Sequence, residues 1–185
     1  MVKQPNKVLV NVALTEFNAL RNEIMNRSSS LFTLLNLNIT VTATICGFVL
    51  SKTADSRLLL ILPLLSPALG MLSLDHSFNI NNIGNYIKTQ IRPVILDNIE
   101  YEDLRLLNYE SFVARYEQNV LLRLLPLGLP LMLLFIAIPL SASLFLTSKL
   151  QNTWEKFLLV AGLIMIVSYM VFWIKFMMQP FKQKS

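Results

Sequence analysis

Residues 35–46, LNLNITVTATIC, alternate apolar and polar side chains, and this period of two alone predicts a half-buried β-strand. The stretch nevertheless lies inside a longer apolar run, with SSSLFTL before it and GFVL after it. The chain holds four such runs, at 31–50, 58–74, 124–147 and 157–178. At about 1.5 Å of helix per residue, the runs are near the roughly 20 residues needed to cross a bilayer, and the second, at about 17, is close to the lower limit.

Backbone pairing decides between strand and helix for this stretch. Inside lipid, every amide must be paired within its own helix or within a closed barrel. A single strand among three helical runs would leave its amides unpaired, so we predict that residues 35–46 are helical. The predicted fold class is all-α: a four-helix transmembrane protein built from two helical hairpins, with long helices that extend into the cytoplasm.

Composition supports a membrane protein. Of the 185 residues, 54% are hydrophobic and only 15% are charged, with a net charge of +5, and the mean hydropathy is +0.54. A soluble domain of this size normally carries more charge. The short links 51–57 and 148–156 hold four of the 16 Lys and Arg residues. Eleven of the other 12 lie in the termini and the central segment, and Lys175 lies near the end of the last apolar run that adjoins the C-terminal tail. The positive-inside rule therefore places both termini and the centre in the cytoplasm.

These observations divide the chain into five parts. They are a cytoplasmic amphipathic helix at 1–30, a first transmembrane hairpin at 31–74, a cytoplasmic helical segment at 75–123, a second transmembrane hairpin at 124–178 and a cytoplasmic tail at 179–185. Neither glycine nor proline interrupts residues 8–46, so one long helix is expected from about residue 8 to 50.

Two further local expectations concern the later helices. An isoleucine stripe is expected to end at Pro93, because proline normally terminates a helical pattern. Tyr169 and Trp173 are expected at the membrane–water interface, where aromatic rings are enriched.

Polar residues of the first run share one helical face. Steps of three and four residues align Asn22, Asn26, Ser29, Thr33, Asn36, Thr40, Thr44, Gly47 and Ser51. A shorter patch on the opposite face holds Asn38, Thr42 and Cys46. Small and hydroxyl residues commonly serve helix packing, but Asn and Thr can also line a water-filled ion path. Both interpretations stay open; the two polar faces favour a homo-oligomer, and the pore-lining candidates are Thr33, Asn36, Thr40, Thr44 and Gly47.

Catalytic chemistry is not expected. The single histidine, His76, follows Asp75 directly, and adjacent residues on a helix do not face each other. The sequence has no phosphate-binding glycine loop and no metal-ligand spacing. We therefore expect neither an enzyme nor a bound cofactor or metal.

Two motifs carry a resemblance. The pattern ExxxLRxEIxxR, from Glu16 to Arg27, enters the first hairpin, and IxxIGxYI, from Ile80 to Ile87, follows it. Over residues 13–92 the chain resembles a broad group of small bacterial four-span membrane proteins, most of them uncharacterised. Similar small proteins include antiphage-defence channel effectors such as the Hailong effector. The resemblance implies a multi-pass protein of the bacterial inner membrane, gated by a nucleotide or oligonucleotide from a partner nucleotidyltransferase.

Two functional hypotheses follow from these patterns. In the first, the protein is an oligomeric channel-type effector whose cytoplasmic helices bind an anionic ligand. Arginine favours phosphate contacts, and the ligand-binding candidates are Arg21, Arg27, Lys88 and Arg92. In the second, it is a non-conducting membrane interaction or scaffold protein that docks a cytoplasmic partner through the same helices.

Overall fold

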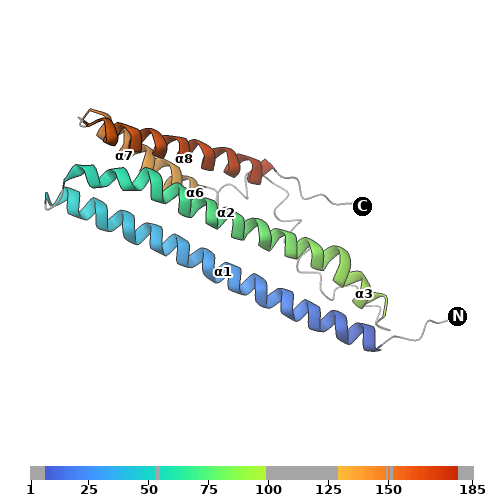
Figure 1. Ribbon diagram of the computed structural model, residues 1–185. Helices are drawn as coiled ribbons and strands as arrows, with labels where there is room; N and C mark the ends of the chain where they lie inside the picture. The colour runs from blue at the N-terminus through green and yellow to red at the C-terminus, as the bar shows by residue number, and fades with distance from the viewer. Residues whose placement is uncertain (1–6, 53–54, 99–128, 149, 151, 179–185) are drawn as a thin grey trace.

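The first helix is continuous from end to end. The computed structural model describes residues 7–52, 55–98, 129–148, 150 and 152–178, and all regular elements within these ranges are helices (Figure 1). Helix α1 (Lys7–Leu50) spans 44 residues and includes 35–46. The all-α prediction is confirmed, and so is the single helix expected from about residue 8 to 50. Backbone pairing therefore outweighs the period of two in the side chains.

The chain then returns alongside α1 (Figure 1). Lys52 takes a positive φ of 57° in the turn, and Asp55 Oδ1 accepts a hydrogen bond from the Arg57 backbone N–H at 3.0 Å. The returning segment begins as a 3₁₀-helix, η1, and continues through α2, a π-helical turn, η2, and α3. Their bounds are Ser56–Ile61, Leu62–Tyr86, Ile87–Ile91 and Arg92–Leu96.

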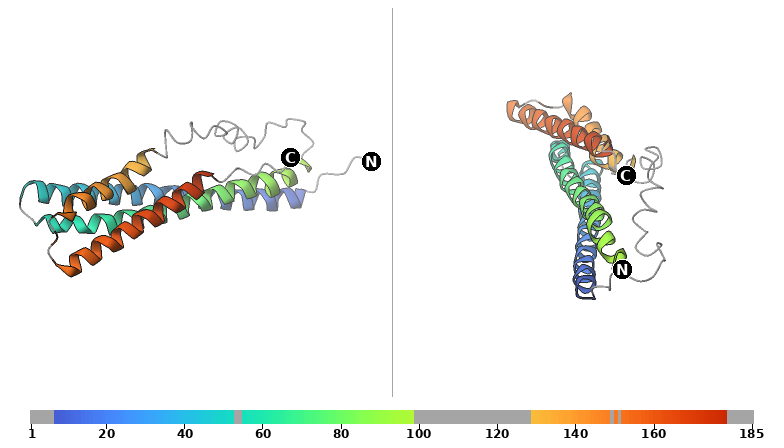
Figure 2. Two further views of the ribbon diagram at one scale, coloured as in Figure 1. Left: turned by 90° about the horizontal axis from the view of Figure 1, so that it is seen from above. Right: turned by 90° about the vertical axis from the view of Figure 1, so that its right-hand side faces the viewer.

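A second pair of helical segments packs against the first. It consists of α6 (Leu129–Met132), the π-helical turn η4 (Leu133–Ala137), α7 (Ile138–Thr147) and α8 (Thr153–Met178). Helix α2 lies between α1 and α8 (Figure 2). In an 18-residue apolar stretch of each long helix, 56% of the residues are buried in the segment Ser56–Leu96 that contains α2, against 11% in α1 and 22% in α8. Helix α2 is therefore the centre of the described bundle, and the described helices cover α1 on one side only.

Three helices are long and apolar enough to cross a membrane: Lys7–Leu50, Ser56–Leu96 and Thr153–Phe176. They contain the predicted runs 31–50 and 58–74 and all but the last two residues of the run 157–178. The run at 124–147 is described from Leu129 onward, and its apolar helix Leu133–Thr147 is shorter. The cytoplasmic helices and tail predicted within 99–128 and 179–185 lie outside the described residues.

The π-helical turns occur at corresponding places before two prolines. Turn η2 ends at Ile91, two residues before Pro93, and η4 ends at Ala137, two residues before Pro139. Proline has no N–H, and its ring collides with the carbonyl four residues earlier; a wider turn removes that collision. The expectation that the helix ends at Pro93 is therefore wrong, because the chain stays helical to Leu96.

Helix α1 is too long for a bilayer. Its 44 residues span about 66 Å at about 1.5 Å per residue, roughly twice the hydrocarbon thickness. We call residues 7–30 and 75–96 the stalk, and the opposite end, with the two short loops, the loop end.

In the stalk, Ala13 packs with Ile91 and Ile95, and the Tyr86 hydroxyl donates to Glu16 Oε1 at 2.8 Å. This contact with the Glu16 carboxylate raises the pKa of Tyr86.

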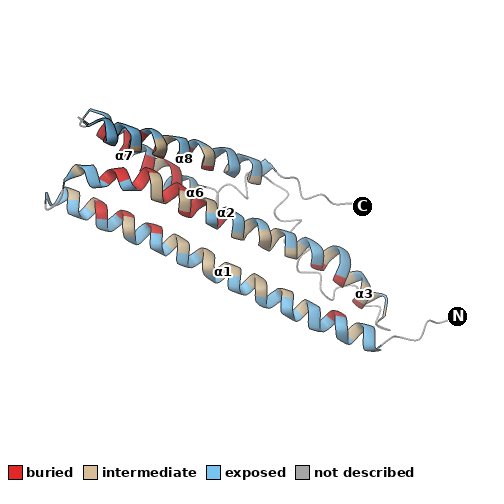
Figure 3. Cartoon of the chain, in the orientation of Figure 1, coloured by how far each residue is buried: buried red, intermediate tan, exposed pale blue. Residues whose placement is uncertain are grey.

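The central core forms where α2 faces η4, α7 and α8, as the buried ribbon in Figure 3 shows. Tyr169 is completely buried there and meets Phe135 edge to face, with ring centroids 5.6 Å apart. The expectation that Tyr169 lies at the interface is thus wrong. Gly70 provides the physical reason, since its missing side chain leaves space for the Tyr169 ring against α2.

An ion pair joins the two short loops at the loop end. Arg57 Nε lies 3.2 Å from Glu155 Oε1, and the Asn152 side-chain amide donates to the same oxygen at 3.1 Å. Glu155 is only 7% exposed, so its carboxylate depends on these partners more than a surface carboxylate does. The pair therefore ties the start of α8 to the turn between α1 and α2.

Replacing Arg57 with glutamine should weaken this end of the bundle. Arg57 is about half exposed, so solvent screens the pair and we expect a loss of about 1 kcal/mol in the free energy of unfolding. Thermal unfolding in detergent measures the loss, which should shrink at high salt. Lys156→Gln, which removes an exposed charge nearby, is the matched control; equal effects of both variants would contradict a role for the pair.

Candidate functional site

The polar face predicted on α1 lies on the outer surface of the bundle. All nine of its positions are exposed, and we call them the polar stripe: Asn22, Asn26, Ser29, Thr33, Asn36, Thr40, Thr44, Gly47 and Ser51. The five pore-lining candidates, Thr33 to Gly47, form its part within the apolar run 31–50. The fold thus leaves the whole stripe uncovered by the described helices.

Most hydroxyl groups of the polar stripe are satisfied by their own helix. The Thr33 hydroxyl donates to the Ser29 carbonyl at 3.0 Å, and the Thr44 hydroxyl donates to the Thr40 carbonyl at 2.7 Å. Such bonds to the preceding turn are usual for Ser and Thr in helices. These threonines therefore tolerate lipid better than an amide would.

Asn36 differs from its neighbours on the stripe. Its side chain is exposed and makes no hydrogen bond within the part of the chain that the structure describes. The amide has two donor hydrogens and an accepting oxygen, and lipid chains offer no partner for them. Gly47, further along, faces open space, because no heavy atom lies within 4 Å of a Cβ built there. The stripe can therefore accept a neighbour or water.

The opposite polar patch is used inside the molecule. Asn38 is 1% exposed, and its Oδ1 accepts a hydrogen bond from the Ser66 hydroxyl of α2 at 2.5 Å. Thr42 is also buried, and Cys46 packs at the edge of the cluster that includes Ile45 and Leu59. Of the two polar faces, one thus binds α2 and the other stays exposed. Ser66, a polar residue within the apolar run 58–74, is not among the residues that the sequence pattern singles out.

The four candidate ligand-binding residues lie along the stalk. Arg21 is exposed, with its guanidinium carbon 5.8 Å from the Phe17 ring centroid. Arg27 Nε pairs with Glu23 Oε1 at 2.7 Å. Lys88 lies in η2, and Arg92 begins α3. As ligand contacts, these four residues stay a prediction.

Their spacing along the stalk is wide. The hydrogen bond between Tyr86 and Glu16 places these two residues at the same height along the two antiparallel helices. Arg92 lies six residues beyond Tyr86, and Arg27 lies eleven residues from Glu16 in the other direction. At about 1.5 Å per residue, the two side chains start roughly 25 Å apart along the helix axis. The structure thus distributes the basic residues along a line and does not gather all four at one point.

Comparisons with known proteins add no relative. No protein-family model matches the chain, and neither curated proteins nor solved structures give a match. Among the described residues, no group of three or more His, Cys, Asp or Glu side chains could hold a metal ion. Three of its helices are long and apolar enough to cross a membrane, which is typical of a membrane protein. We infer its function from the arrangement of these side chains.

Proposed function

We propose that this protein is an oligomeric integral membrane channel-type effector, in which the polar stripes of neighbouring copies line the conducting path. The observation that carries the proposal is that every position of the stripe is exposed, with the Asn36 amide unpaired in the described residues. An unsatisfied polar group within lipid costs several kcal/mol. Assembly around water would satisfy Asn36, Thr40 and Thr44 together, and uncharged polar groups suffice for an ion path.

The stalk would receive the gating signal. It extends beyond the apolar runs, and its basic residues Arg21, Arg27, Lys88 and Arg92 lie along one hairpin. Because Arg27 and Arg92 are separated by roughly 25 Å of helix, they suit an extended anion such as an oligonucleotide better than a mononucleotide. In this proposal the ligand comes from a partner nucleotidyltransferase, and the protein acts in antiphage defence.

The same proposal includes the position in the membrane. The shorter apolar helix Leu133–Thr147 would complete a fourth span, together with the apolar residues that precede it, and give two transmembrane hairpins. Both termini and the stalk would lie in the cytoplasm, at the bacterial inner membrane. The distribution of Lys and Arg residues supports this orientation.

Conductance in planar bilayers tests the channel. Purified protein should conduct, and Asn36→Leu or Thr40→Leu should lower the single-channel current about tenfold, because a hydrophobic ring favours dewetting of the path. Ile39→Leu is the matched control, since Ile39 is 51% exposed outside the stripe and should leave the current unchanged. Unaltered currents in both stripe variants would remove the pore-lining assignment.

A second candidate function is a non-conducting membrane interaction or scaffold protein. One observation favours it: Val8 and Val12 of the stalk are 72% and 59% exposed, on a part of α1 that lies beyond the apolar run. Exposed apolar side chains outside the membrane commonly mark a protein contact. In that case no conductance appears, and a cytoplasmic partner co-purifies with the parent but not with a Val8→Ser and Val12→Ser variant.

A further inference from the structure

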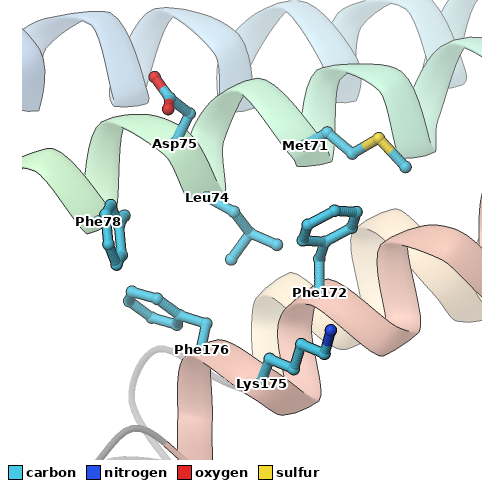
Figure 4. Close-up of a pocket in the computed structure, with 7 residues that line it drawn as sticks. All are labelled: Met71, Leu74, Asp75, Phe78, Phe172, Lys175 and Phe176. Carbon is cyan, nitrogen blue, oxygen red and sulfur yellow. The ribbon is translucent and has the colours of Figure 1, made fainter.

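A cavity of about 470 Å³ opens between α2 and α8 at the stalk end of the apolar bundle (Figure 4). Its volume is within the range typical of small-molecule sites. Helix α2 contributes Leu74, Asp75 and Phe78, and α8 contributes Phe172, Lys175 and Phe176. The cavity is separate from the polar stripe, because neither of its helices is α1.

Residue size explains why the helices separate here. Nearer the loop end, α2 and α8 touch through glycines: Gly162 faces Pro63, and Gly70 faces the Tyr169 ring. From Gly70 toward the stalk, the residues of α2 and α8 that face each other are large. Met71 is the first of these large residues on α2. Side chains of this size hold the helices apart and leave the space between them incompletely filled.

The cavity wall is apolar with one cation. In Figure 4, Leu74 and Phe78 point from α2 toward Phe172 and Phe176 of α8, and the Asp75 carboxylate points away from the space between the helices. Asp75 Oδ2 accepts a hydrogen bond from the Asn79 amide at 3.1 Å.

The ammonium of Lys175 lies beside Phe172 (Figure 4). No carboxylate of the described residues lies within 4.0 Å of it. The positive charge at the cavity is thus not neutralised by an ion pair with the described helices.

The position of the cavity at the edge of the apolar layer indicates which kind of ligand it binds. The apolar run of α2 ends at Leu74, and Asp75 and Lys175 lie at this boundary. A lysine here can extend its ammonium to the level of the lipid headgroups while its methylene groups stay in the apolar layer. A slot with aromatic walls below a cation matches a molecule with an apolar chain and an anionic head. Basic pockets between membrane helices bind anionic lipid headgroups in this way.

We propose that this cavity binds one acyl chain of an anionic phospholipid from the surrounding leaflet, with the lipid phosphate on Lys175. The lipid chain lies between Phe78 and Phe172 and replaces the missing contact between α2 and α8. The site gives the protein a preference for anionic over zwitterionic lipid. This preference does not depend on whether the protein conducts ions.

Trp173 follows the lining residue Phe172 and packs against the buried cluster that contains Leu74, so it can report on the cavity. The chain has two tryptophans, and Trp154 lies at the loop end, so Trp154→Phe leaves Trp173 as the only tryptophan. This variant is reconstituted into phosphatidylcholine vesicles that contain brominated-chain phosphatidylglycerol or brominated-chain phosphatidylcholine, since bromine quenches nearby tryptophan. We expect half-maximal quenching at about a tenfold lower fraction of phosphatidylglycerol than of phosphatidylcholine, the ratio that one charge-assisted contact gives. Equal quenching by the two lipids, or quenching by neither, would overturn the proposal.

Three substitutions in this background assign the preference to the cavity. Lys175→Gln should abolish the tenfold preference, and Lys175→Arg should keep it, because arginine retains the charge. Lys156→Gln, at the loop end of the same helix, is the matched control and should keep it as well. A preference that survives Lys175→Gln, or that disappears equally in Lys156→Gln, would show that Lys175 does not hold the headgroup.

Soluble competitors distinguish lipid from free phosphate. Glycerol phosphate and inorganic phosphate, added at millimolar concentration, should leave the quenching by brominated phosphatidylglycerol unchanged, because they lack the chain that fills the cavity. Relief of quenching by either anion would overturn the lipid assignment and indicate a phosphate site at Lys175.

Discussion

Gly70→Ala is expected to lower the free energy of unfolding by about 1–3 kcal/mol, the usual cost of overpacking a filled core. A Cβ at this position would lie 2.7 Å from Tyr169 Cε2 and 3.0 Å from Phe135 Cγ. Both rings are completely buried, so neither can move aside without disturbing the core. Alanine also gains about 1 kcal/mol of helix propensity, and this gain offsets only part of the clash. Gly70→Leu should prevent α2 and α8 from packing at all.

Two other glycines provide internal controls for Gly70. Gly162 has the same constraint, with Pro63 Cβ 2.7 Å from the added carbon, so Gly162→Ala should also destabilise. Gly47 has no heavy atom within 4 Å of that position, so Gly47→Ala should be neutral or slightly stabilising. Thermal unfolding in detergent, followed by helix content, ranks the three variants. Equal stability of all three would contradict the close approach of α2 to α8.

A double variant assigns the cost to one contact. Tyr169→Leu removes the ring that meets the new methyl group, so Gly70→Ala should cost much less in a Tyr169→Leu background than alone. The difference between the two costs is the interaction energy of the pair, and 0.5–3 kcal/mol is typical for residues in contact. Additive effects would mean that Gly70→Ala acts elsewhere in the bundle.

Much of the fold follows from one physical requirement, the pairing of backbone amides in lipid. This requirement predicted that 35–46 is helical despite its period of two, and α1 confirms it. The absence of glycine and proline from 8–46 predicted that the stalk and the first apolar run share one helix. Both inferences depend on local chemistry, which a single sequence contains.

Features that depend on a second helix could not be predicted. Tyr169 is buried because Gly70 leaves space on α2, and no pattern within α8 indicates that partner. Pro93 fails to end its helix because η2 widens the turn before it. The cavity beside Phe172 depends on the separation of α2 and α8. Each of these is a property of contacts between segments far apart in the sequence.

The candidate site could be predicted in part from the sequence. The period of the helix predicted two polar faces on α1, and α1 has both. The sequence did not determine which face would meet α2, because both faces carry asparagine and threonine. The position of Ser66 on α2 determines which face packs there, since the Ser66 hydroxyl donates to Asn38. Asn36 is therefore on the outer surface. The pore-lining and ligand-binding roles stay predictions that experiment must test.

Asn36 and Asn38 should therefore respond differently to the same substitution. Asn38→Leu removes the acceptor of the Ser66 hydroxyl in a buried site, and we expect the monomer to lose about 1 kcal/mol, as for other interhelical hydrogen bonds in membranes. Asn36→Leu removes no hydrogen bond within the described helices, so the free energy of monomer unfolding should change by less than about 0.5 kcal/mol. Thermal unfolding in detergent measures both.

Self-association should show the opposite order. If copies meet through the polar stripe, Asn36→Leu removes an amide contact at each interface and should raise the dissociation constant of the assembly about tenfold, the equivalent of about 1.4 kcal/mol. Asn38→Leu leaves the outer face intact and should not change that constant. Energy transfer between labelled copies, measured as protein is diluted in vesicles, gives both values. An assembly that tolerates Asn36→Leu but dissociates with Asn38→Leu would reverse the roles of the two faces, because only groups on the interface can contribute to its free energy.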